Sequence, residues 1–131
     1  MPLSSSENAG SLPRLEMVAE GLIFDARQAG VEAAVNYNGS LLPLASGVLL
    51  AGWQCGREKH TPTNTLRLAE SRDDGHSWSL LSWEFDSHWQ GIKGSFLVAE
   101  MVEVEVGRVL LFTTWVDRSD PQRPLFDPET E

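Results

Sequence analysis

The chain has 131 residues, which is enough for one ordinary domain with its own hydrophobic core. Its net charge of −9 and its pI near 4.7 disfavour nucleic acid and anionic membrane surfaces as partners, because both would repel it. Cys55 is the single cysteine, which excludes an intrachain disulfide and a cysteine-rich metal site. The histidines, His60, His76 and His88, do not form a short metal-ligand motif, so we expect no metal and no other cofactor.

Residues 1–14 are rich in Ser, Pro, Gly and Asn, and we expect them to form a flexible N-terminal tail. This stretch lacks a basic region followed by an apolar one, so it does not resemble a secretory signal, and a cytoplasmic location is the default expectation. Because no apolar run approaches about 18 residues, we expect no transmembrane helix.

Apolar and alternating runs, separated by turn residues, predict an all-β chain. In chain order we expect strands at 22–24, 40–44, 48–53, 65–70, 78–85, 96–106 and 109–115. Pro43 indicates that the second of these is irregular or lies at a sheet edge. Residues 54–64 and 86–94 are expected to be loops, and residues 119–131 an irregular C-terminal tail.

The octapeptide Ser71-Arg72-Asp73-Asp74-Gly75-His76-Ser77-Trp78 stands between two expected strands. Asp73 can accept hydrogen bonds from backbone N–H groups a few residues on. Gly75 can supply the positive φ that closes a turn. Ser71 and Ser77 add hydroxyls, and the Trp78 ring can fold beneath the loop. The octapeptide therefore predicts a hairpin turn held by side-chain hydrogen bonds.

An internal repeat links two parts of the chain. Gly47 lies in a predicted turn and begins an apolar run that ends at Trp53. Gly107 lies in a second predicted turn and begins a similar run that ends at Trp115. The two glycines are about 60 residues apart, which is compatible with the long repeats of bladed folds.

The order Ser-x-Asp-x-Gly-x-Ser-Trp resembles the Asp box of the sialidase (neuraminidase) and BNR-repeat superfamily, with Ser77 in place of the usual threonine. The resemblance implies a six-bladed β-propeller with the Asp box on an outer hairpin. It therefore implies structural roles for the Asp-box residues, which are Ser71, Asp73, Gly75, Ser77 and Trp78.

The resemblance covers residues 35–118, and we expect residues 15–118 to form a partial propeller of about two blades. A propeller needs about four to eight. We therefore interpret the chain as the N-terminal part of a longer protein that self-associates when isolated.

The resemblance also implies a glycoside hydrolase. The family binds the sugar carboxylate with three arginines and uses a Tyr–Glu nucleophile and an Asp acid/base. Here Asn38 stands where the first arginine is expected, and residues 56–64 contain no Asp. We expect a hydrolase as the complete protein, with this segment inactive alone. The alternatives are a non-catalytic glycan-binding or structural propeller, and an Asp-box hairpin in an unrelated all-β protein.

Six residues are candidates for contact with a carbohydrate ligand: Asn38, Arg57, Glu58, His60, Trp115 and Asp117. Arg57 can bind a carboxylate, and Glu58 or His60 can move a proton. The alternatives are a solvated charged loop at 57–60 and a Trp115 that packs between blades. The pair His88–Trp89 is either a sugar-facing loop or a loop anchor.

Overall fold

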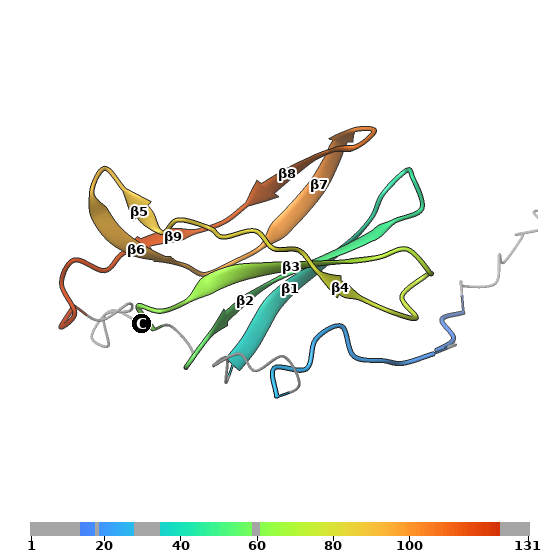
Figure 1. Ribbon diagram of the computed structural model, residues 1–131, viewed down its shortest axis with the longest axis horizontal. Helices are drawn as coiled ribbons and strands as arrows, with labels where there is room; N and C mark the ends of the chain where they lie inside the picture. The colour runs from blue at the N-terminus through green and yellow to red at the C-terminus, as the bar shows by residue number, and fades with distance from the viewer. Residues whose placement is uncertain (1–13, 18, 28–34, 59–60, 124–131) are drawn as a thin grey trace, which may run out of the picture.

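The computed structural model describes residues 14–17, 19–27, 35–58 and 61–123, and in these ranges the chain is all-β and antiparallel, without a helix (Figure 1). Consequently no helix able to cross a membrane is found in the described ranges. The strands are β1 (Val35–Pro43), β2 (Leu49–Gly56), β3 (Thr65–Ser71), β4 (Ser79–Leu80), β5 (His88–Trp89), β6 (Ile92–Phe96), β7 (Glu100–Glu105), β8 (Arg108–Phe112) and β9 (Trp115–Asp117).

The first sheet is a meander with the order β1-β2-β3-β4. Strand β1 lies at its edge, as Pro43 predicts, and its register with β2 shifts between Tyr37 and Ser40. Residues 51–56 of β2 are all buried, so both faces of this central strand are covered.

The second half of the chain is one long hairpin with an interruption. Strand β6 pairs with β9 and β7 pairs with β8, and the Leu97 N–H donates to the Thr114 carbonyl between the two pairings, at 3.0 Å. Gly107 closes the hairpin at φ +77°, and Gly47 closes the β1–β2 turn at φ +86°. Both turn glycines of the sequence repeat therefore use a conformation that favours glycine.

The core of the first sheet contains Ala51, Trp53, Cys55 and Ala69. Phe24 packs against Trp53 with ring centroids 5.5 Å apart, and the Trp53 indole N–H donates to Asn36 Oδ1 at 3.0 Å. Burial raises the pKa of the Cys55 thiol, which disfavours the reactive thiolate.

Three expected elements are corrected. Residues 22–24 form no strand, because Phe24 is held by side-chain packing on the sheet rather than by a strand ladder. The strand expected at 78–85 is limited to Ser79–Leu80, because the ladder to β3 ends there and Trp83 is exposed. The loop expected at 86–94 contains β5 and the start of β6, joined by Gln90 and Gly91 at φ 52° and 78°.

The hairpin of β7 and β8 packs one face against the first sheet. A Cβ on Gly52 would lie 3.1 Å from Met101 Cε, so this glycine permits the close approach of β7. The Glu103 carboxylate accepts hydrogen bonds from the backbone N–H groups of Gly107 and Ala45, at 2.8 and 2.7 Å, and these lower its pKa. The opposite face is apolar and exposed, and its residues are Val102, Val104, Leu110 and Phe112.

Candidate functional site

The Asp box forms the predicted turn between β3 and β4. The buried Ser71 hydroxyl donates to Asp73 Oδ1 at 2.8 Å and accepts the Gly75 N–H at 2.8 Å. Asp73 Oδ1 also accepts the Ser77 N–H at 2.8 Å, and Asp73 Oδ2 accepts the Ser77 hydroxyl at 2.5 Å. One carboxylate therefore bridges both ends of the turn.

Trp78 and Gly75 complete this turn. The Trp78 indole N–H donates to the Gly75 carbonyl at 3.1 Å, and Gly75 has φ +87°. Hydrogen bonds from the side chain and then the backbone of Ser77, followed by the Ser71 hydroxyl, lower the pKa of Asp73 to about 2. Every polar group named here is used to hold the turn, so the contacts support structural roles for these residues.

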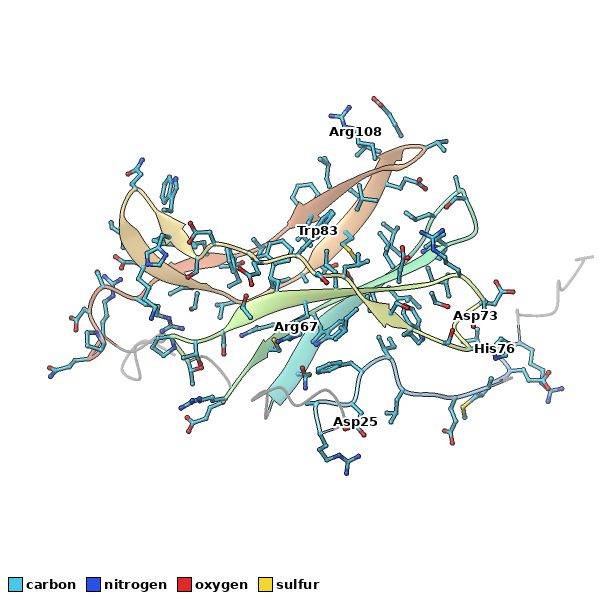
Figure 2. All side chains as sticks on the ribbon, in the orientation of Figure 1. Asp25, Arg67, Asp73, His76, Trp83 and Arg108 are labelled. Atoms are coloured by element: carbon cyan, nitrogen blue, oxygen red, sulfur yellow. The ribbon has the colours of Figure 1, made fainter. Side chains whose placement is uncertain are left out.

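The Asp box and the loop after β2 lie at opposite ends of the first sheet. Leu49 pairs with Ser71 at one end, and Cys55 pairs with Thr65 at the other. The seven residues of β3 separate the two ends by roughly 20 Å. Figures 1 and 2 show this separation, with Asp73 and His76 in the turn beyond β3 and the end of β2 on the far side.

Two candidates on the first sheet lie at the end opposite the Asp box. Arg57 and Glu58 directly follow β2 and are exposed. Asn38 lies at the register shift of β1, but its side chain lies outside the described part of the structure, as does the whole of His60. At the base of the loop, the buried Asn64 accepts a hydrogen bond from the Thr61 hydroxyl through Oδ1 at 2.9 Å.

Asp117 holds the turn after β9. Its Oδ1 accepts the Ser119 N–H at 2.8 Å, and its Oδ2 lies 3.2 Å from Arg123 Nη2. The Ser119 hydrogen bonds are the largest cause of the lowered pKa of Asp117, and Arg123 adds to them. These contacts favour a local structural role for Asp117.

The structure brings Trp115 to residues that the sequence analysis did not combine with it. The Trp115 indole N–H donates to the Ser87 carbonyl at 2.8 Å, and its ring meets the Trp89 ring edge to face, with centroids 5.6 Å apart. Trp89 and Trp115 line a surface hollow together with His88, Asp86 and Phe96, and the sequence did not predict a role for Asp86 or Phe96. The short spacing of Asp86, His88 and Trp89 in the sequence could have indicated that these three residues lie together. The sequence does not predict the pairing of β6 with β9, which adds Phe96.

No three His, Cys, Asp or Glu side chains converge as metal ligands within the residues that the structure describes. Comparisons of the chain with protein-family models, with curated proteins and with solved structures give no match. At the level of fold, the structure shows an all-β chain of several small antiparallel sheets.

Proposed function

We propose that this chain forms part of a sialidase-type β-propeller that recognises glycans. The observation that carries the proposal is the Asp-box hairpin, which connects the third and fourth strands of a four-stranded antiparallel meander. Propeller blades are four-stranded sheets of this kind. The position of the Asp box, at the end of the sheet away from Arg57 and Glu58, also agrees with an outer hairpin remote from the ligand.

The packing of the second hairpin adds support. Met101 on one face of β7 lies against Gly52 of the first sheet, as the strands of one blade pack on the next. The exposed apolar face on the other side of β7 and β8 is of the kind that a further blade would cover.

Recognition is favoured over hydrolysis for this chain. Asn38 carries no charge for a sugar carboxylate, and the sequence from 56 to 64 contains no Asp to act as acid/base. Hydrolysis by a complete propeller is the second candidate, and one observation favours it. Arg57 and Glu58 are consecutive residues directly after β2, and both are exposed, so the surface there carries a cation and a carboxyl group.

The proposal predicts that the purified 131-residue chain binds glycans without cleaving them. A glycan array that carries neutral and acidic glycans measures binding, and a set of fluorogenic glycosides measures turnover. The heat-denatured chain is the control for nonspecific binding. Absence of binding to every glycan would overturn the proposal. Turnover that is lost in Arg57→Ala would instead favour the second candidate.

The proposal also predicts self-association of the isolated chain through the apolar face of β7 and β8. Val102 and Leu110 are cross-strand partners on this face, and 42% and 40% of their surfaces are exposed. Light scattering after size exclusion should give a mass above 14.5 kDa for the natural chain. Leu110→Thr combined with Phe112→Thr should shift the mass toward the monomer. Leu15→Thr, at a fully exposed position outside this face, should leave the mass unchanged. A natural chain that is monomeric at high concentration would contradict the prediction.

A further inference from the structure

A hollow lies where strand β5, the end of β6 and the start of β9 meet. Its lining residues are Asp86, His88, Trp89, Phe96 and Trp115, and its volume is about 490 Å³. Small-molecule sites commonly have volumes of about 300 to 1,000 Å³. The pairing of β6 with β9 sets Phe96 directly opposite Trp115, so residues from distant parts of the chain meet here. Strands β5, β6 and β9 lie together on the left of Figure 1.

Two tryptophans line this hollow together with Phe96, and the two differ in how firmly they are held. Trp115 is half-buried, donates its indole N–H to Ser87, and lies over Gly94, where a Cβ would overlap its ring. Trp89 rests against Trp115 at an interplanar angle of 78° and keeps 61% of its surface exposed. A fixed indole therefore supports an exposed one, which presents a large apolar surface to the solvent.

His88 and Asp86 supply the polar part. Asp86 Oδ1 accepts the backbone N–H of His88 at 2.9 Å and lies 2.9 Å from its Nδ1. This contact places a proton on Nδ1, so the neutral ring keeps Nε2 as a hydrogen-bond acceptor. The same hydrogen bonds from His88, the backbone one first, lower the pKa of Asp86. The carboxylate is therefore ionised at neutral pH, and its Oδ2 takes no part in these contacts.

This combination of groups matches the chemistry of a sugar ring. One face of many pyranoses is lined by C–H bonds, whose partial positive charge is attracted to the negative face of an indole ring. Sugar hydroxyls can donate to His88 Nε2 and to the Asp86 carboxylate. Neither lysine nor arginine is among the five lining residues, and Asp86 would repel an anionic sugar.

We infer that the hollow of Asp86, His88, Trp89, Phe96 and Trp115 binds an uncharged pyranose unit, which stacks on Trp89 and donates hydroxyl protons to His88 and Asp86. This inference rests on the proposed recognition of glycans, and it names the site and the charge class of the ligand. Arg57 and Glu58 are not among the residues that line this hollow.

The test is a titration of the 131-residue chain, followed by calorimetry, with neutral hexaoses of glucose, mannose, galactose, xylose and N-acetylglucosamine. At least one hexaose should bind, and Trp89→Ala should weaken its affinity about tenfold or more, as the loss of aromatic stacking does elsewhere. His88→Ala should weaken it as well. Trp83→Ala is the matched control, because Trp83 is 67% exposed but is not among the residues that line the hollow. Figure 2 shows Trp83 on the connection that follows β4. The exposure of Trp89 and His88 means that both variants should keep the circular dichroism spectrum of the natural chain.

Lactose and 3′-sialyllactose form a matched pair for the charge class, and the acidic member should bind no better than the neutral one. If a hexaose binds equally to the natural chain and to Trp89→Ala, the site is wrong and the proposed function stands. If the glycan array shows only acidic ligands, glycan recognition stands and the neutral class is wrong. If no glycan binds in any experiment, the proposed function and this inference both fail.

Discussion

Gly94→Ala will destabilise the protein by about 2–3 kcal/mol, in the upper part of the range of about 1–3 kcal/mol that is typical of overpacking in a close-packed interior. Gly94 is buried, and a Cβ at this position would overlap Nε1 and Cε2 of the Trp115 ring and lie 2.6 Å from its Cζ2. The indole is rigid and must move away as a whole, which breaks its hydrogen bond to the Ser87 carbonyl. Urea denaturation at one fixed protein concentration measures the change, because self-association would otherwise add to the apparent stability.

Gly21→Ala is the control for the general effect of replacing a glycine, since a Cβ there would meet no atom within 4 Å. Its free energy of unfolding should stay within about 0.5 kcal/mol of that of the natural chain. The double variant Gly94→Ala/Trp115→Ala should cost less than the sum of its two single changes, because removal of the ring removes the overlap. Strict additivity, or a Gly94→Ala protein as stable as the natural one, would show that the close packing of these two residues does not matter.

Asp73→Ala will lower the melting temperature by several degrees at neutral pH, and the difference from the natural chain will shrink in acid. The pKa of Asp73 is about 2 in the folded state, against an ordinary value of 3.8. A lowered pKa means that the carboxylate stabilises the fold above about pH 4 and that this contribution is lost as the pH falls toward 2. Asp73 is exposed, so solvent screening reduces the effect of its charge.

Thermal unfolding at a series of pH values between 7 and 2 measures this difference. Asp73→Asn, which keeps one oxygen acceptor but loses the charge, should lie between alanine and the natural residue. Glu84→Ala is the control, because it removes an exposed carboxylate that takes no part in the turn. The prediction fails if Asp73→Ala follows the melting curve of the natural chain at every pH, or if the gap between them widens in acid.

The Asp box could be predicted from the sequence because its contacts are local. Ser71, Asp73, Ser77 and Trp78 lie within one octapeptide, and their hydrogen bonds span at most four residues. Residue type and spacing therefore specify the turn almost completely. The same reason explains the two turn glycines, Gly47 and Gly107, whose positive φ values depend on their immediate neighbours.

The extent of the strands was harder to predict, because it depends on partners that are distant in the sequence. Residues 79–83 have an apolar pattern, but the ladder to β3 ends at Leu80. Leu22, Ile23 and Phe24 are apolar too, yet they form no strand. Of these three residues, Phe24 packs on the core of the first sheet, and Leu22 and Ile23 are exposed. The pattern of a segment shows that it prefers an apolar environment, and only the tertiary arrangement decides whether a strand provides it.

By itself, the sequence determined the all-β class, the Asp-box turn and the hairpins at Gly47 and Gly107, because each depends on local backbone and side-chain chemistry. Only the tertiary structure decided two further features. The meeting of Trp89 with Trp115 depends on the pairing of β6 with β9. The alternation of residues 101–106 defines two faces but not which one is buried. Packing against the first sheet turns Met101 and Glu103 inward, and Val102 and Val104 are left facing the solvent.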